Sequence, residues 1–382
     1  MPLDLLDVST QVRQMGELLA ARRADQHRRL SLLEEVLAAY RDRWQELAEL
    51  AERVRERVAV PTGPLDEVVP APVLGLKAYT ALATDGAEID PDRHGGAGDF
   101  FLINVGRVAI PYGQPGRPVE LASATRLGYT DEDLYIVDPR DARRQVPMRD
   151  RHLDALRTVE ELRALADLAE QQQGEAPAVA LVDGTLLFSV LEERPRDFLR
   201  ARFYSEYVQQ LERLRHAGVA VAAYASRSRG VDLVNLFRAA FSPEHAAALR
   251  GLSDAHILGR ALGRKWERSG LFRVRSNVHD PYFGLHRVYF FLLQTGDEIA
   301  RVEMPEWVAA SNEHRTNLHA VLVDQCQKGF GYPAVLARAD DRAVISLSDR
   351  NVLDTLVRQE LARRGVLAKP SAKLHRKQVR TV

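Results

Sequence analysis

The sequence predicts a mixed α/β protein with a helical arm at its N-terminus. Residues 9–58 carry apolar side chains at alternating steps of three and four, which is the spacing of a heptad-patterned helix. Farther along, short apolar runs bounded by Gly, Pro or Asp alternate with segments of helical periodicity. Two pairs of apolar runs, one early and one late, indicate that part of the sheet is antiparallel.

The composition excludes several classes of protein. The 382 residues include 53 Lys and Arg against 53 Asp and Glu, and 46% are hydrophobic, which rules out a wholly disordered chain. This length suits about two domains. We see no secretory signal, no apolar run of the ~18–20 residues that span a bilayer, and one cysteine, Cys326, which cannot form an internal disulfide. We therefore expect a cytoplasmic protein that does not contact membranes. Zero net charge argues against a globally basic nucleic-acid binder but leaves room for a local basic stripe.

The arm is predicted to cover residues 1–60. Arg22 and Gln26 interrupt its apolar seam, so it is either two helices that meet near residues 24–27 or a helix with a polar layer that sets the register. Its exposed faces mix Arg and Glu, as a solvated helix surface does. We expect the arm to serve packing or dimerisation rather than chemistry.

The remaining elements follow a linker at residues 61–75, where four prolines disfavour a helix. We expect a domain over residues 76–362 and a basic tail over 363–382, which carries seven Lys or Arg and no acid. The elements expected within the domain are strands at 79–84 and 100–110, a helix at 151–171, a strand at 178–182, a helix from 198 to Gly218, a strand at 219–224, a hairpin at 288–305 that turns at 295–297, a helix at 317–328, a strand at 343–347 and a helix at 352–364.

Two of the apolar strands run into the same dipeptide, Asp followed by Gly, at Asp85 and Asp183. An Asp at the carboxyl end of a buried strand projects into the crevice where α/β sheets bind ligands. Two carboxylates brought together repel each other unless a cation lies between them, so Mg²⁺ or Mn²⁺ is their natural partner. Two such ions ~3.5–4 Å apart support phosphodiester cleavage. The alternative is that each Asp-Gly only makes a turn.

Glu160 and Glu161 are candidates for a third carboxylate, because they lie on the expected helix before the second Asp-Gly strand. Only one of them can share a face with the crevice, since neighbours on a helix diverge by about 100°. The alternative is that both are solvated surface residues.

A compact cluster of cations and hydroxyls follows the strand at 219–224, next to an expected helix N-terminus. It suits a phosphate, although a solvated arginine-rich loop is the alternative. Its members are Ser226, Arg227, Ser228 and Arg229. The chain contains no GxxxxGK[ST] and no GxSxG, which argues against an ATPase and an α/β-hydrolase.

The order of these motifs resembles that of the NurA nuclease family, particularly its bacterial members. The matching stretches, within residues 76–360, are ATDGAEIDPDRHGG with FFLINVGRVAIPYG, ALVDGTL, YASRSRGVDLV, FFLLQTGDEIARVEMPEWVA and LHAVLVDQCQKGFGYPAVLARADDRAVISLSDR. The resemblance implies an RNase H-like mixed sheet flanked by helices and a Mn²⁺-dependent deoxyribonuclease, with Mg²⁺ as an alternative metal. It also implies a homodimer and a hexameric HerA-type ATPase as partner in double-strand-break end resection and repair. The implied substrates are single-stranded DNA and duplex ends, cut as a single-strand endonuclease or 5′–3′ exonuclease.

The resemblance also assigns site residues. Asp85 and Asp183 match the family's two metal-binding aspartates, and Glu160 or Glu161 would be the acidic ligand on the intervening helix. Tyr332, in GYP, matches an active-site tyrosine.

One position departs from the family pattern, which places a histidine eight residues after the tyrosine. This chain has Asp340 there. An aspartate is anionic at pH 7 and cannot replace a neutral imidazole as proton carrier. Either the site works with a fourth carboxylate, or its activity is reduced or lost.

Three functions remain open. The first is a metal-dependent DNA nuclease in which Arg227 and Arg229 orient backbone phosphates. The second is a non-catalytic DNA-binding or scaffold subunit of the same fold, and the third is an adaptor that binds only a protein partner. Metal-dependent cleavage of single-stranded DNA separates the first from the others, and salt-sensitive DNA binding separates the second from the third.

Overall fold

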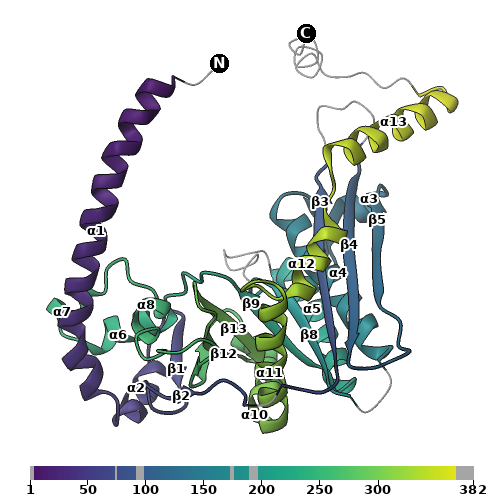
Figure 1. Cartoon of the computed structure of the whole chain (residues 1–382). Helices are drawn as coiled ribbons and strands as arrows, with labels where there is room; N and C mark the ends of the chain where they lie inside the picture. Colours follow the sequence, from purple (N-terminus) through teal and green to yellow (C-terminus); the bar gives the residue numbers. More distant parts are fainter. Residues whose placement is uncertain (1–3, 74, 92–98, 173–175, 189–196, 367–382) are drawn as a thin grey trace. The chain divides into compact units, whose positions relative to one another are not determined.

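The chain folds into two compact units, whose helices and strands are labelled in Figure 1. The structure is a computed structural model that describes residues 4–73, 75–91, 99–172, 176–188 and 197–366. Unit 1 comprises residues 1–71, 226–280 and 287–302, and unit 2 comprises 72–225, 281–286 and 303–382. These units do not coincide with the expected segments, because residues 226–280 and 287–302 pack with the N-terminal segment. The basic tail lies outside the described residues from position 367 onward.

Unit 1 is built on a sheet with the strand order β1–β11–β12–β13, to which β10 and β2 are attached. Strand β1 pairs antiparallel with β11, and β11 pairs antiparallel with β12. The expected late hairpin is formed by β12 and β13, and it turns at Gly296, whose φ is 107°. The strands are β1 (Val58–Pro61), β2 (Val68–Val69), β10 (Arg268–Ser269), β11 (Phe272–Arg275), β12 (Val288–Gln294) and β13 (Ile299–Pro305), the last of which ends in unit 2.

The helices of unit 1 are α1 (Leu5–Ala39), α2 (Trp44–Ala51), α6 (Asp232–Ala240), α7 (Pro243–Ala248) and α8 (Asp254–Leu258). Helix α1 passes through residues 24–27 without a break, which excludes the alternative of two helices meeting there. Leu30 and Leu33 are its buried residues, whereas its N-terminal half exposes a row of apolar side chains. The exposed set is Leu5, Leu6, Val8, Val12, Met15, Leu18 and Leu19.

Unit 2 contains a mixed sheet with the strand order β5–β4–β3–β8–β9, flanked by helices. Strands β3, β4 and β5 are antiparallel neighbours, whereas β8 is parallel to both β3 and β9. Buried apolar runs explain the central strands, because a strand covered on both faces has no polar side to show. The strands are β3 (Tyr79–Ile89), β4 (Phe101–Tyr112), β5 (Glu120–Gly128), β8 (Ala178–Asp183) and β9 (Ala220–Ala225), with a separate hairpin of β6 (Tyr135–Asp138) and β7 (Asp141–Pro147).

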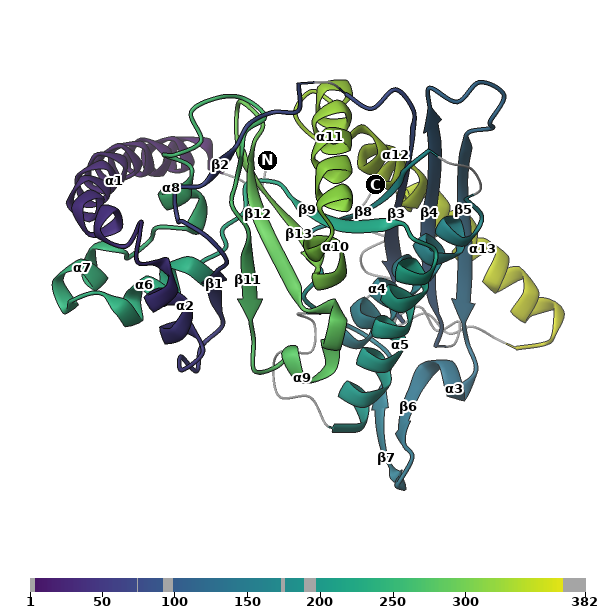
Figure 2. The ribbon, with the colours of Figure 1, turned by 90° about the horizontal axis from the view of Figure 1, so that it is seen from below.

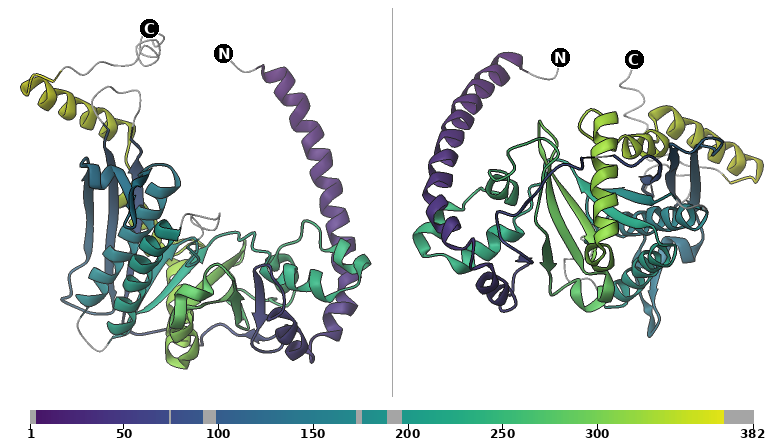
Figure 3. Two further views of the ribbon diagram at one scale, coloured as in Figure 1. Left: turned by 180° about the vertical axis from the view of Figure 1, so that it is seen from behind. Right: turned by 60° about the horizontal axis from the view of Figure 1, so that its bottom comes forward.

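Helices cover both faces of this sheet. Helix α4 packs on β3 and β4 and lies beside α5, as Figures 2 and 3 show, while α12 packs on β3, β4 and β5 from the other side. The helices are α3 (Asp131–Leu134), α4 (Arg151–Glu170), α5 (Asp197–His216), α10 (Glu306–Ala310), α11 (Asn312–Lys328), α12 (Ala334–Ala343) and α13 (Leu347–Arg363), together with α9 (Asp280–Phe283) and the 3₁₀ turn Gly284–His286.

The expected strand at residues 343–347 is wrong. Helix α12 ends at Ala343, and α13 begins at Leu347 behind a capping box made by Ser346 and Asp349. The expected elements from residue 100 to the hairpin at 288–305 are confirmed within a few residues at their ends. No helix in the described part of the chain is long and apolar enough to cross a membrane.

Candidate active site

Asp85 and Asp183 become neighbours through the register of two parallel strands. The ladder between β3 and β8 ends at the pair Thr84 and Val182, so the next residue on each strand is one of the two aspartates. Strand β8 ends at Asp183, as expected. Strand β3 continues past Asp85, which lies opposite Gly106 of β4, so the expectation that this strand stops at Asp85 is wrong.

Gly106 allows helix α12 to lie directly on strand β4. A Cβ at this position would come within 2.3 Å of the carbonyl oxygen of Ala339, which is backbone and has little room to move. Asp340 follows Ala339 and is exposed at the same place. Burial raises the pKa of both Asp85 and Asp183, and the negative charge of Asp340 raises both further. The side chain that departs from the family pattern therefore acts electrostatically on both aspartates.

Tyr332 lies on the turn between α11 and α12 and donates a hydrogen bond to the carboxylate of Asp183. Its ring packs edge-on against Tyr224, with the centroids 5.5 Å apart. Tyr224 is the β9 residue paired with Asp183. Burial and the charge of Asp183 raise the pKa of the Tyr332 phenol well above its ordinary value, so this hydroxyl remains a neutral hydrogen-bond donor.

Glu161 lies on the α4 side of the sheet, where its charge interacts with that of Asp85. Gly86 makes room for it, because a Cβ at this position would come within 2.4 Å of Glu161 Oε1. Burial, together with the charge of Asp85 and against the lowering effect of Arg157, raises the pKa of Glu161 to about 7. Its side chain is 16% exposed. A further carboxylate thus lies close enough to Asp85 for the two charges to interact.

Glu160 lies elsewhere, as the divergence of adjacent helix residues requires. It forms ion pairs with Arg126 of β5 at 2.5 Å and with Arg163 at 2.6 Å. These three side chains line a separate pocket of 140 Å³ between α4 and the strands β4 and β5. Of the two candidate glutamates, Glu161 is the one whose charge interacts with that of Asp85.

Arg157 is a site residue that the sequence reasoning missed. Its Nη1 lies 2.5 Å from Glu161 Oε1, and its Nε lies 2.6 Å from an oxygen of Glu88. The guanidinium also donates to the carbonyl oxygen of Gly86. It places one positive charge beside a cluster of carboxylates. The spacing of Arg157 and Glu161, four apart on one helix, was the available signal.

The donor chemistry of this cluster fits a hard divalent cation. Carboxylate oxygens are the ligands that Mg²⁺ and Mn²⁺ prefer, and the mutual repulsion that raises their pKa values is relieved by a cation. As the side chains stand, no three His, Cys, Asp or Glu residues in the described part of the chain are close enough to hold one ion. Asp85 Oδ1 accepts the backbone N–H of Gly86 at 2.9 Å, and Glu161 is held by Arg157.

The cluster of cations and hydroxyls belongs to unit 1, whose second segment begins at residue 226, whereas the carboxylates belong to unit 2. Ser226 donates to Glu298 at 2.6 Å, and Arg227 Nε pairs with the same carboxylate at 3.2 Å. The Arg227 side chain remains 83% exposed. With Ser228 and Arg229 it lines a pocket of 660 Å³ in unit 1. The loop thus presents exposed cations, but one of them already has an acidic neighbour.

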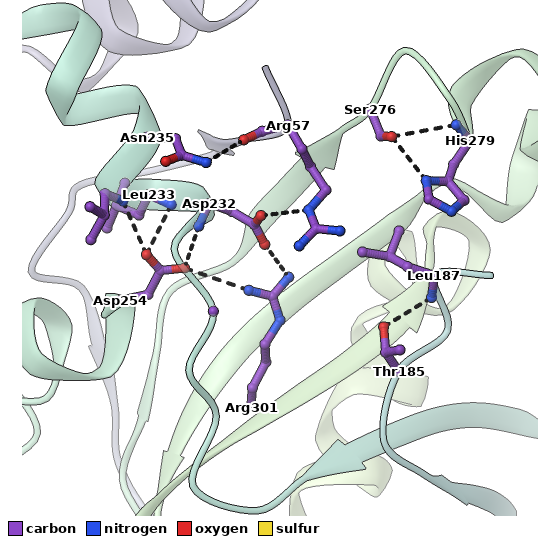
Figure 4. A network of polar contacts seen from close by, with 12 residues as sticks. Arg57, Thr185, Leu187, Asp232, Leu233, Asn235, Asp254, Ser276, His279 and Arg301 are labelled. Carbon is purple, nitrogen blue, oxygen red and sulfur yellow. Dashed lines mark hydrogen bonds and ion pairs between the residues drawn. The ribbon is translucent and has the colours of Figure 1, made fainter. Parts of the chain in front are cut away.

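The helix N-terminus expected to assist this loop is already occupied by a carboxylate. Helix α6 begins at Asp232, and the backbone N–H groups of Asp232, Leu233 and Val234 donate to Asp254 at 3.0, 3.0 and 3.1 Å. Figure 4 shows that Asp254 and Asp232 are in turn held by Arg301. A phosphate at this helix end would have to displace Asp254, so the expectation of a helix-assisted phosphate site is wrong.

Comparison with known proteins agrees with the fold. Residues 79–345 match the NurA domain. No curated protein sequence matches significantly. The crystal structure of the NurA nuclease from Sulfolobus solfataricus is similar with a TM-score of 0.51 and 14% identity, over 87% of this chain and 96% of that chain. A crystal structure of NurA with manganese is 10% identical, over 82% of this chain and 96% of that chain, with a TM-score of 0.37. Because the NurA domain accounts for well over half of its residues, the chain belongs to the NurA family.

Proposed function

We propose that this protein is a divalent-metal-dependent deoxyribonuclease. One observation carries the proposal: Asp85 and Asp183 follow the last residue pair of the β3–β8 ladder, where the charge of Asp340 acts on both of them and Glu161 interacts with Asp85. Membership of the NurA family supports it, and the similar Sulfolobus protein is a nuclease.

Each residue of the cluster then has a distinct task. Asp85, Asp183 and Glu161 would hold Mn²⁺ or Mg²⁺, and Asp340 would add a fourth carboxylate. Bound metal supplies an activated water and stabilises the leaving oxygen of a phosphodiester. Tyr332 keeps Asp183 oriented through its hydroxyl, and Arg157 does the same for Glu161. Ser226, Arg227, Ser228 and Arg229 bind backbone phosphates of the DNA.

The biological setting follows from the family resemblance. The protein acts in the cytoplasm on single-stranded DNA and duplex ends, as a single-strand endonuclease or 5′–3′ exonuclease. Its partner is a hexameric HerA-type ATPase in double-strand-break end resection and repair, and it works as a homodimer. The exposed apolar half of α1 supports an assembly of this kind, because such a surface needs a cover.

A cleavage assay with labelled single-stranded DNA tests the activity. We expect cleavage with Mn²⁺, none with EDTA, and loss of cleavage in Asp85→Asn and Asp183→Asn, since an amide binds a cation more weakly than a carboxylate. Asp341→Asn is the matched control, because Asp341 is next to Asp340 but is 61% exposed and pairs with Arg338. Wild-type cleavage by either folded variant of the two aspartates would reject the assignment.

A non-catalytic DNA-binding subunit of the same fold is the second candidate. The observation that favours it is Asp340, which stands where the family pattern has a histidine and adds repulsion to Asp85 and Asp183. In this case the wild type binds DNA with a steep salt dependence but does not cut it, and Asp340→His gains cleavage. For the nuclease we expect the opposite pattern: Asp340→His keeps or raises cleavage that is already present, and Asp340→Ala lowers it if the carboxylate is a ligand.

A further inference from the structure

The turn that carries Tyr332 also carries a fully exposed aromatic ring. Phe330 lies between the end of α11 and the start of α12, and its side chain is 99% exposed. Its φ of 55° lies in the left-handed region, where a bulky side chain is rare and strained. Neither burial nor backbone preference explains a phenylalanine here, since glycine would fit this backbone better.

The surrounding turn is held in place from several sides. The N–H of Gly331 donates to the carbonyl oxygen of Cys326 at 2.7 Å, and the Tyr224 hydroxyl donates to the carbonyl oxygen of Gly331 at 3.2 Å. A Cβ at Gly329 would come within 1.9 Å of the carbonyl oxygen of Tyr332, so the chain is tightly folded on itself. These contacts keep Phe330 strained and hold it in a fixed relation to Tyr332, as happens at sites where strain serves function.

We propose that Phe330 is a stacking platform for an unpaired base of the DNA strand beside the scissile phosphate. The inference rests on the proposed nuclease function. Two peptide steps, which span at most ~7 Å, separate Phe330 from Tyr332, whose hydroxyl contacts Asp183. A ring two residues from the tyrosine that contacts Asp183 can reach a nucleotide next to the bond that is cut.

The chemistry around the ring fits a nucleic acid better than a protein partner. The residues on either side of Phe330 are glycines, and the helix that follows exposes Arg338 and Arg342. A protein interface has an apolar centre of several side chains, whereas single-strand binding combines isolated aromatic rings with cations. Stacking tolerates any base, because every base has a π face. The ring thus favours single-stranded DNA or a frayed end over a flush duplex.

Binding measured in EDTA tests this without requiring cleavage. The probe is a fluorescein-labelled single strand that contains 2-aminopurine, whose emission is quenched by stacking. We expect Phe330→Ala and Phe330→Leu to raise the Kd at least fivefold, the equivalent of a base stack of ~1 kcal/mol, and Phe330→Trp to preserve both affinity and quenching. Phe330→Leu is the matched control for an apolar but non-aromatic side chain.

An abasic nucleotide locates the contact. An abasic nucleotide at the stacked position should raise the Kd of the wild type for the strand and leave the Kd of Phe330→Ala unchanged. Phe330→Gly guards against misfolding, since glycine relieves the positive φ: its Tm should be equal to or above that of the wild type while its affinity falls.

Several results would overturn the inference. Unchanged affinity and quenching in Phe330→Leu would do so, as would an abasic effect of equal size in wild type and Phe330→Ala. Loss of a protein partner by Phe330→Ala with normal DNA binding would assign the ring to a protein interface instead. Phe330-dependent DNA binding without Mn²⁺-dependent cleavage would refute the nuclease function alone.

Discussion

Gly86 is the residue whose role differs most from what its sequence context indicates. The dipeptide Asp-Gly suggests a turn at the end of a strand, yet β3 continues for three residues beyond Gly86. The glycine instead leaves space on the α4 side for the side chains of Glu161 and Arg157. Sequence alone predicted a metal site at the two aspartates and offered Glu160 and Glu161 as candidates for a third carboxylate. It could not choose between Glu160 and Glu161, because the partners that hold Glu160 come from β5 and from the same helix.

Gly86→Ala should impair cleavage while the fold survives. The new methyl group would lie 2.4 Å from Glu161 Oε1 and 2.9 Å from Arg157 Cγ, and both belong to flexible side chains that can move. Moving the Glu161 carboxylate by about 1 Å should lower Mn²⁺-dependent cleavage roughly 10- to 100-fold. Cleavage rates at several Mn²⁺ concentrations and a thermal melt measure the two effects.

Gly263→Ala is the control for this prediction. Gly263 has no heavy atom within 4 Å of a built Cβ, so the same substitution should leave cleavage and stability nearly unchanged. If Gly86→Ala cleaves like the wild type, Glu161 either tolerates the displacement or has no part in the chemistry.

At the scale of elements, continuous apolar runs predicted the strands of the unit 2 sheet that are buried on both faces. Strand β5 was missed, because most of its residues are exposed and its only buried one is Gly128. The run at 343–347 was misjudged because Val344 and Ile345 favour strands in isolation. The capping box at Ser346 and Asp349 was the contrary signal for a helix start.

The N-terminus of helix α6 is held by a buried ion cluster, and disrupting this cluster should destabilise the folded protein. Arg301 is 4% exposed, pairs with Asp232 at 2.8 Å and approaches Asp254 at 3.6 Å. Its guanidinium also lies 3.7 Å from the ring centroid of Phe290. Arg301→Met leaves two buried carboxylates with less compensation, so we expect the free energy of unfolding at pH 8 to fall by about 3–5 kcal/mol. Denaturant titration followed by tryptophan fluorescence measures the loss.

The decrease in the free energy of unfolding caused by Arg301→Met should depend on pH. Burial raises the pKa of Asp254 to about 6, above the ~3.9 of an unfolded aspartate, whereas Arg301 lowers it. The native state therefore binds this proton more strongly, and the stability it contributes at low pH disappears as pH rises through about 6. Removing Arg301 raises the native pKa further, so the difference between wild type and Arg301→Met should grow from pH 5 to pH 8. A constant difference would contradict this account. Arg238→Met, on the exposed face of α6, is the control and should stay within ~0.5 kcal/mol of wild type.

At the scale of the whole molecule, the division into units was the part that sequence reasoning could not supply. The chain leaves unit 1 after residue 71 and returns to it at residues 226–280 and 287–302. Strand β1 pairs with β11, more than 200 residues away, through backbone hydrogen bonds that leave no pattern in local composition. Segment boundaries drawn from prolines and charge runs cannot detect such returns. The helical arm, in contrast, was predictable because its periodicity is local.

The two halves of α1 differ in burial, because only the C-terminal half packs within its own unit. Leu30 and Leu33 are buried, whereas Val12 and Leu19, on the same seam, are 52% and 51% exposed. We expect the exposed half to cover itself by self-association or against a partner.

Deleting residues 1–20 should therefore lower the sedimentation mass or abolish partner binding, while leaving the packed part of α1 and the Mn²⁺ affinity intact.

Val12→Glu with Leu19→Glu should act like the deletion, since burying two carboxylates in an apolar interface is unfavourable. Thr10→Glu with Gln14→Glu adds the same charge on the opposite face, at ~100° per residue, and should behave like wild type. Because the two double variants differ only in the face that they charge, a change in mass confined to the first assigns the interface to the seam. Equal behaviour of both pairs, or an unchanged mass and partner after the deletion, would leave the exposed seam without a role in assembly.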